Sequence, residues 1–220
     1  YLEPSAGSGN FSNLISGCIA YDIKPTAENI IEADFLKLDI PYKEGRLIFG
    51  NPPFGDRNNL ARSFYKKAVE ISDAIAFILP ISQLDNRDSL YEFDLIESVD
   101  LGVLEYSGMK IHCCFNIYCR PKNGLNSKPN LKIDWIKIYR DDQDGYGNVE
   151  YDFAICRRGN VGTLRTERLE TQTYKIKVMD SSKIEEVKNT ILSFNWSGYK
   201  KHQSAPSLSK NDIYRLFKTF

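Results

Sequence analysis

The sequence contains few of the residues that bind transition metals or form disulfide bonds. It has two histidines, His112 and His202, and their spacing matches neither a metal site nor a catalytic dyad. Its five cysteines include no Cys-x-x-Cys pair, their number is odd, and several lie in apolar runs. We therefore interpret the histidines as structural or surface residues, expect no metal site, and interpret the cysteines as buried reduced thiols of a cytosolic protein.

The sequence also lacks a signal peptide, an apolar run of membrane length and an internal repeat. These absences argue against a secreted protein, a membrane protein and a solenoid, and favour a cytoplasmic location. The chain has 220 residues, of which 42% are hydrophobic and 26% charged. This size allows one sizeable hydrophobic core with a small appended region.

The formal net charge is zero, but the charges are unevenly distributed. Residues 1–119 contain 10 Lys or Arg and 17 Asp or Glu, whereas residues 120–220 contain 19 and 12. A basic C-terminal part suits a polyanionic partner, and ordinary solvated surface charge is the alternative interpretation.

Strand and helix signals alternate through the first 120 residues and predict an open, mostly parallel α/β sheet. The expected strands are 1–3, 18–23, 46–50, 74–79, 101–106 and 113–119, the last two forming a pair. The expected helices are 10–16, 26–32, 59–71 and 89–97, and Leu60, Phe64, Ala68 and Ile71 share one face of the third.

Residues 121–129 are rich in turn formers and predict a linker between domains 1–120 and 130–220. The second domain is expected to be a smaller α+β region. Its expected strands are 131–139, 149–156 and 174–179, with a polar turn at 141–148. A capping box at Ser182 and Glu185 predicts a helix with Ile184, Val187 and Ile191 on one side, and a last helix is expected at 211–217.

A glycine-rich turn follows the first expected strand. Gly7 and Gly9 remove side chains where a nucleotide-like cofactor would approach the backbone, and the expected helix would offer its N–H groups. Asp22 ends the next strand, where an acid can accept hydrogen bonds from both ribose hydroxyls. Asp34 and Phe35 then come where an acid and an aromatic ring suit an adenine. Taken singly, each residue also suits an ordinary loop.

The segment Asn51-Pro52-Pro53-Phe54 directly follows a predicted strand. The Asn51 side-chain oxygen and the Pro52 carbonyl can accept hydrogen bonds from an aromatic amine and favour the pyramidal nitrogen that attacks. The two prolines hold the backbone rigid, which is electrostatic preorganisation, and Phe54 offers a face for stacking. A strand-ending turn is the alternative, but the position behind the glycine turn favours methyl transfer.

Residues 1–120 resemble the class I S-adenosylmethionine-dependent methyltransferases, more narrowly the group that methylates adenine N6 in DNA. The resemblance implies a Rossmann-like sheet with helices on both faces and S-adenosyl-L-methionine as cofactor. It implies cofactor contacts from Glu3, Pro4, Gly7, Gly9, Asp22, Ile23, Asp34, Phe35 and Asn51. It assigns the catalytic segment to Asn51, Pro52, Pro53 and Phe54, and makes Phe115 the aromatic residue that helps hold the target base, although Phe115 equally suits a core position.

The family has a helix and a loop before its first strand that help to close the cofactor pocket, and the given sequence begins at Tyr1, inside that strand, so that it is either a fragment or a record without the N-terminal part. In the second domain, the basic loop with Arg157 and Arg158 is predicted to contact phosphates, with a surface turn as the alternative. Lys200 and Lys201 form a second basic stretch.

These features predict an adenine-N6 DNA methyltransferase of a restriction-modification system. Its partners would be double-stranded DNA with the target adenine flipped out and a cognate restriction endonuclease. The alternatives are an RNA adenine or protein glutamine methyltransferase, and a non-catalytic nucleic-acid-binding subunit.

Overall fold

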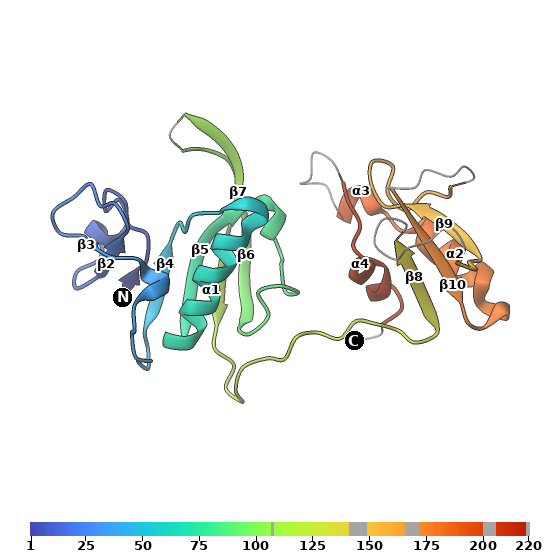
Figure 1. The fold of residues 1–220 in the computed structure, drawn as a ribbon, viewed down its shortest axis with the longest axis horizontal. Helices are drawn as coiled ribbons and strands as arrows, with labels where there is room; N and C mark the ends of the chain where they lie inside the picture. The colour runs from blue at the N-terminus through green and yellow to red at the C-terminus, as the bar shows by residue number, and fades with distance from the viewer. Residues whose placement is uncertain (107, 141–148, 166–171, 200–205, 219–220) are drawn as a thin grey trace. The chain divides into compact units, whose positions relative to one another are not determined.

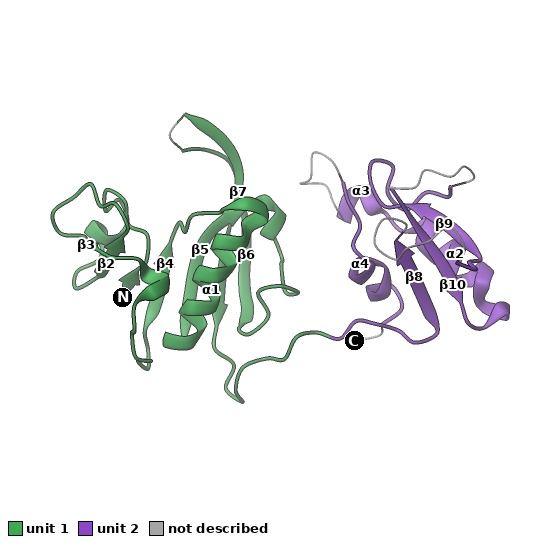
Figure 2. Ribbon diagram, viewed as in Figure 1, with its two compact units in different colours: residues 1–129 green, residues 130–220 purple. Residues whose placement is uncertain are grey.

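The computed structural model describes residues 1–106, 108–140, 149–165, 172–199 and 206–218. These residues form two compact units, residues 1–129 and residues 130–220 (Figure 2). The segment 121–129, expected to be a linker, belongs to the first unit. The polar turn expected at 141–148 lies outside the described residues, as do Lys200, Lys201 and His202.

Unit 1 is built on a seven-stranded sheet with the order β3-β2-β1-β4-β5-β7-β6 (Figure 1). The first five strands in this order are parallel, and β7 is antiparallel to both of its neighbours. The strands are β1 (Leu2–Glu3), β2 (Ile19–Asp22), β3 (Ile31–Glu32), β4 (Leu47–Gly50), β5 (Ala74–Pro80), β6 (Asp94–Tyr106) and β7 (Met109–Cys119). This arrangement confirms the predicted α/β class with a mostly parallel, Rossmann-like sheet.

The direction in which the chain adds strands reverses between β1 and β4. From β1 the chain proceeds outward to β2 and β3, and then returns to place β4 on the other side of β1. In open α/β sheets, ligands bind outside the carboxyl ends of the strands at such a switch point. A ligand site is therefore expected at the segments that follow Glu3 and Gly50.

The helix α1 (Asn59–Ile71) has the bounds that its hydrophobic periodicity predicts. It packs against β5 and buries Phe64, Tyr65 and Ala68 in one core with Ile75 and Phe77 of that strand. Leu60 was expected on the same face but is 39% exposed, because it lies in the first turn of the helix.

The predictions of three further helices in this unit, at 10–16, 26–32 and 89–97, are wrong. Residues 10–16 contain only the 3-10 helix η1 (Ser12–Leu14), since Ser, Asn and Gly there favour turns over α-helix. Residues 26–32 end in β3, which pairs with β2. Residues 94–97 begin β6, where pairing with β7 replaces the expected helix. The remaining 3-10 helices are η2 (Phe35–Lys37), η3 (Asp56–Asn58) and η4 (Ile81–Gln83).

Strands β6 and β7 continue as a two-stranded arm beyond the carboxyl edge of the parallel strands (Figure 1). Their register runs from Asp94 opposite Cys119 to Tyr106 opposite Met109, with irregularities at two points in β6. Such bulges increase the local twist of a strand pair. The tip of the arm therefore lies on the same edge of the sheet as the switch point.

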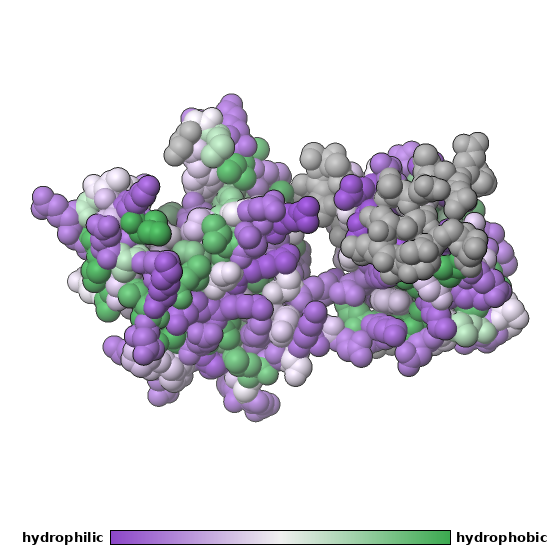
Figure 3. All heavy atoms as spheres, in the orientation of Figure 1, coloured by the Kyte–Doolittle hydropathy of each residue, from purple (hydrophilic) through white to green (hydrophobic). Residues whose placement is uncertain are grey.

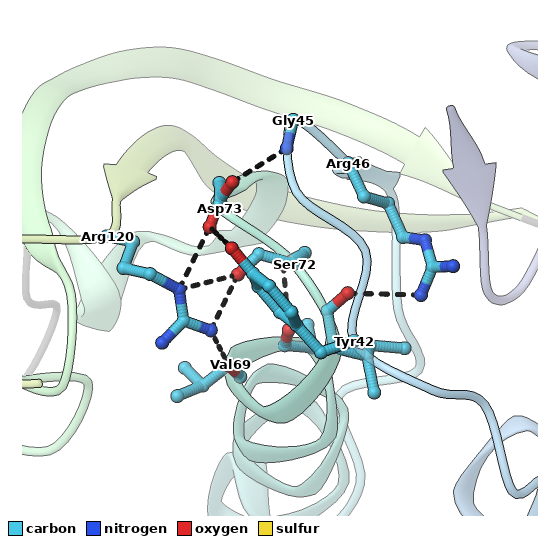
Figure 4. A network of polar contacts seen from close by, with 9 residues as sticks. Tyr42, Gly45, Arg46, Val69, Ser72, Asp73 and Arg120 are labelled. Atoms are coloured by element: carbon cyan, nitrogen blue, oxygen red, sulfur yellow. Dashed lines mark hydrogen bonds and ion pairs between the residues drawn. The ribbon is translucent and has the colours of Figure 1, made fainter.

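The opposite edge of the sheet is held by Arg120, the residue that follows β7 (Figure 4). Its guanidinium donates to the carbonyl oxygens of Val69 and Ser72 at the end of α1 and to the carboxylate of Asp73, at 2.5, 2.8 and 3.0 Å. It also lies over the rings of Tyr42 and Phe93. One cation thus satisfies two of the carbonyl groups at the C-terminal end of α1.

Unit 2 has a three-stranded antiparallel sheet with the order β8-β10-β9. Its elements are β8 (Ile136–Arg140), β9 (Phe153–Cys156), β10 (Thr173–Val178), η5 (Ser181–Lys183), α2 (Ile184–Ser193), α3 (Trp196–Tyr199) and α4 (Lys210–Arg215). Val187 and Ile191 are buried as predicted, but Ser182 and Glu185 do not form the expected capping box. Asp180 caps η5 instead, and a capping box joins Ser209 to Asp212.

Hydrophilic side chains cover most of the visible face of unit 1, and the hydrophobic ones form separate patches (Figure 3). Across the described part of the chain, no helix is long and apolar enough to cross a membrane. The same residues contain no group of three or more His, Cys, Asp or Glu side chains arranged to hold a metal ion.

Candidate functional site

The turn after β1 is anchored by Glu3, whose side chain is 1% exposed. The backbone N–H of Ser12 donates to its carboxylate at 2.8 Å, and burial raises the pKa of this carboxyl group. Gly50 at the end of β4 packs against it, since a Cβ there would lie 3.2 Å from the Glu3 Cγ. The Glu3 side chain thus connects three segments: β1, the end of β4 at Gly50 and the segment that contains Ser12.

The glycine turn leaves its backbone open on one side. Gly7 and Gly9 both have positive φ, at 57° and 81°. A Cβ added at Gly7 would meet no atom within 4 Å, whereas one at Gly9 would lie 2.7 Å from the Asn13 amide nitrogen. Glycine at position 9 is therefore favoured by its positive φ, and the open face of Gly7 has room for a ligand.

Asp22 connects this turn to the end of β2. Its two carboxylate oxygens accept the N–H groups of Gly7 at 2.7 Å and Lys24 at 2.8 Å. Each carboxylate oxygen can accept a second hydrogen bond, so these two bonds leave Asp22 able to accept hydrogen bonds from the hydroxyl groups of a ribose. Ile23, the next residue, is 64% exposed and offers an apolar surface beside it.

The structure places Asp34 near Asp22, because the N–H of Ala33 donates to the Asp22 carbonyl at 2.9 Å. Asp34 caps η2 and forms an ion pair with Lys37 at 3.2 Å. The ring of Phe35, however, is 1% exposed and stacks on Phe64 in the core. The expectation that this ring contacts an adenine is therefore wrong, since packing against α1 holds it inside.

Asn51 is the first residue after β4, and its side-chain oxygen has no hydrogen-bond partner in the described part of the chain. The Ser5 hydroxyl donates to the Asn51 backbone carbonyl at 3.2 Å and thereby ties the two turns together. The side-chain Oδ1 of Asn51 is buried without a hydrogen-bond partner among the described residues. An unsatisfied buried acceptor costs about 1–3 kcal/mol, which is typical of a site that a ligand completes. Pro52 is buried and Pro53 exposed, so the segment is packed on one side.

The ring of Phe54 is half-buried and meets the edge of Tyr106 at a centroid distance of 6.3 Å. Tyr106 belongs to the tip of the β6–β7 arm, and burial raises its pKa to about 12. No signal in the sequence connects these two residues, because only the curvature of the arm brings them together. An aromatic residue at the end of a strand was the sole available hint.

Phe115, the predicted partner of the base, lies in the middle of β7. It is half-buried and opposite Ile78 and Val99 in the sheet. The ring contact recorded for Phe54 within the described residues is with Tyr106. The structure thus brings Tyr106 to the Asn51–Phe54 segment, and the role of Phe115 in holding a base stays a prediction.

The residues that follow this segment are conformationally strained. Arg57 and Asn58 have positive φ, at 49° and 62°, which is costly for residues with a side chain. The Asn58 side chain donates to the Ser82 hydroxyl at 3.0 Å, and Ser82 lies just after β5. This bond links the segment after β4 to the segment after β5 at the same edge of the sheet.

The predicted phosphate contacts of unit 2 differ between the two arginines. Arg157 is 5% exposed, and its guanidinium lies 6.0 Å from the ring of Tyr174. The expectation that it grips phosphate is therefore wrong, since its side chain is packed inside unit 2. Arg158 is exposed and remains available to an anion.

No protein-family model matches the chain, and no curated protein sequence matches it. Solved structures with a similar fold include the 23S rRNA methyltransferase ErmE, at 17% identity and a TM-score of 0.43, and a tRNA methyltransferase of M. jannaschii, at 19% identity and a TM-score of 0.40. A third is the Thermoplasma acidophilum protein 1320, at 23% identity and a TM-score of 0.40.

These three alignments cover 57%, 55% and 55% of this chain. The chain spans 63% of ErmE, 44% of the tRNA methyltransferase and 74% of the Thermoplasma protein.

Proposed function

We propose that the chain transfers a methyl group from S-adenosyl-L-methionine to the exocyclic amino group of an adenine in nucleic acid. The observation that carries the proposal is the buried Oδ1 of Asn51, which has no hydrogen-bond partner among the described residues. Asn51 is tied to the glycine turn through Ser5 and is followed by Phe54, whose ring contacts Tyr106. An acceptor without a donor at this position suits an amine that donates a hydrogen bond.

The residues after β1 and β2 fit the cofactor. Part of the cofactor would lie against the open backbone face of Gly7. The ribose hydroxyls of the cofactor would donate hydrogen bonds to the Asp22 carboxylate, whose oxygens can each accept one more. When bound, the cofactor supplies an electrophilic methyl group on a sulfonium sulfur.

The chain's own residues would prepare the amine. The Asn51 oxygen and the Pro52 carbonyl accept its N–H groups, which favours a pyramidal nitrogen with an available lone pair. Because Pro53 fixes φ, the Pro52 carbonyl reorients little during the reaction. Phe54 and Tyr106 offer aromatic surface to a flat ring, and this favours a nucleobase over a glutamine side chain.

DNA and RNA both carry the adenine amino group, and in a duplex it must leave the stack to reach Asn51. The test therefore incubates the full chain and labelled cofactor with random-sequence duplex DNA, single-stranded RNA and a glutamine-containing protein. Analysis of the released nucleosides identifies the modified base. DNA labelling supports the predicted adenine-N6 DNA methyltransferase, RNA labelling supports the alternative, and labelled glutamine contradicts the proposal.

Asn51→Ala should reduce turnover at least about 100-fold, since it removes a group aimed at the reacting amine. Asn123→Ala is a matched control, because Asn123 is an exposed residue outside the site. Calorimetry should show that both variants still bind the cofactor. Turnover of Asn51→Ala within about tenfold of the unmodified chain would remove Asn51 from this role, whereas an unmodified chain without any transfer would favour the non-catalytic subunit.

A further inference from the structure

A groove lies between the strand β8 and the helix α4 of unit 2. Its volume is about 640 Å³, and α4 lies alongside β8 in Figure 1. The residues that line it are Lys132, Asp134, Ile136, Lys137, Ile138, Tyr139, Val149, Lys210, Asn211 and Tyr214. The described lining residues have a positive balance of formal charge, three lysines against one aspartate.

Asp134 is the one carboxylate among the described residues that line the groove. Lys132 and Lys137 are both exposed, and no ion pair involves either of them within the described ranges. Cations in a concave surface focus the field that attracts an anion. The groove therefore suits a ligand that carries several negative charges.

The remaining lining residues are suited to a nucleotide. Tyr139 is half-buried and provides an aromatic surface on which a base can stack, and Asn211 provides donors and an acceptor. The volume is that of a pocket for a small molecule, so it accommodates a short stretch of one strand and not the width of a duplex.

The groove borders the free edge of the sheet, since β8 is an outer strand. Free edges also attract extended peptides. Here α4 occupies part of the edge, because Tyr214 of α4 and Ile138 of β8 line the same groove. This contact disfavours a peptide that would pair along the whole strand.

We propose that this groove binds the phosphate backbone of single-stranded nucleic acid, with Lys132 and Lys137 as the principal phosphate contacts. The inference rests on the proposed function only in taking nucleic acid as the substrate. It assigns the anion contacts of residues 130–220 to Lys132 and Lys137 and not to Arg157, which is buried.

The test compares two double variants of the full chain. Lys132→Gln/Lys137→Gln alters the groove, and Lys122→Gln/Lys128→Gln removes two equally exposed lysines that do not line it. Fluorescence anisotropy with labelled oligo-U and oligo-T, measured over a range of salt concentrations without cofactor, gives the salt dependence of binding. Far-UV circular dichroism checks that both variants fold.

The groove variant should reduce the slope of log K against log salt by about 1.4, at about 0.7 for each single-strand phosphate contact. The control variant should keep the slope of the unmodified chain. A difference between oligo-U and oligo-T would identify RNA or DNA as the preferred strand.

Equal slopes for the groove variant and the control variant would overturn the inference. If both variants instead bound an uncharged extended peptide, the groove would be a site where a peptide pairs with the edge strand β8. The measurement needs no methyl transfer. If the groove variant shows the smaller slope although the chain transfers no methyl group, the groove inference stands and the proposed reaction is rejected. If the chain transfers methyl groups but the groove variant keeps the slope of the unmodified chain, the groove inference alone is rejected.

Discussion

Asp22 has one observed role and one proposed role, and a single substitution removes the carboxylate that serves both. It holds the Gly7 backbone in the unliganded chain and is proposed to accept ribose hydroxyls in the cofactor complex. Asp22→Ala should weaken S-adenosyl-L-methionine binding by about 10- to 100-fold, since a hydrogen bond to a charged group contributes about 1.5–3 kcal/mol. Calorimetry measures the affinity. Asp39→Ala, at an exposed acid outside the site, should bind normally, and equal affinities for the two variants would exclude Asp22 from the cofactor site.

Tyr106 allows a test of the aromatic pair that keeps a matched control. Tyr106→Leu removes the ring that meets Phe54, whereas Tyr106→Phe keeps the ring and removes only the hydroxyl. We expect Tyr106→Leu to weaken binding of an oligonucleotide with an unpaired target adenine by about 1–3 kcal/mol. Tyr106→Phe should bind within about threefold of the unmodified chain, on the same scale. If both variants bind equally well, Tyr106 serves only the packing of the arm.

At the scale of elements, the C-terminus of α1 depends on Asp73 as well as on Arg120. The Asp73 carboxylate accepts hydrogen bonds from the Gly45 backbone, the Tyr42 hydroxyl and Arg120, at 2.7, 2.9 and 3.0 Å. The Gly45 bond is the largest of the effects that lower the pKa of Asp73 below its ordinary value of 3.8. A depressed pKa means that the ionised form stabilises the fold.

Asp73→Asn should therefore lower the free energy of unfolding at neutral pH by an amount on the order of 1 kcal/mol. The contribution of Asp73 is complete above pH 3.8 and disappears as the pH falls through the lower folded value. The difference between the variant and the unmodified chain should shrink over the same interval. Urea unfolding followed by circular dichroism at several pH values measures it, and a difference that persists unchanged into acid would contradict this account.

At the scale of the whole molecule, each unit has a hydrophobic core of its own. Both tryptophans, Trp135 and Trp196, belong to unit 2, so tryptophan fluorescence reports on that unit. Ile176→Ala should destabilise unit 2 by about 2–5 kcal/mol and shift the fluorescence midpoint in urea.

Ile75→Ala makes the matching change in unit 1, because Ile75 is also 0% exposed. It should shift part of the circular dichroism transition and leave the fluorescence midpoint in place. If either substitution moved both probes together, the two units would unfold as one cooperative body.

The sequence by itself determined the elements whose signals are local. The amphipathic period of 59–71 and the apolar run of 74–79 are complete within a few turns or pairs of residues, and the structure matches both. The order of the glycine turn, Asp22 and the Asn51–Phe54 segment also follows from the chain, because parallel strands bring their carboxyl ends to one edge.

Only the tertiary structure decided the features that depend on distant partners. Residues 94–97 form a strand because β7 pairs with them, and Phe35 turns into the core because Phe64 lies beneath it. Tyr106 meets Phe54 through the shape of the β6–β7 arm, and Arg157 is enclosed by the packing of unit 2. Pairing and burial between residues far apart in sequence override local propensity, since their free energies exceed the small differences among local conformations.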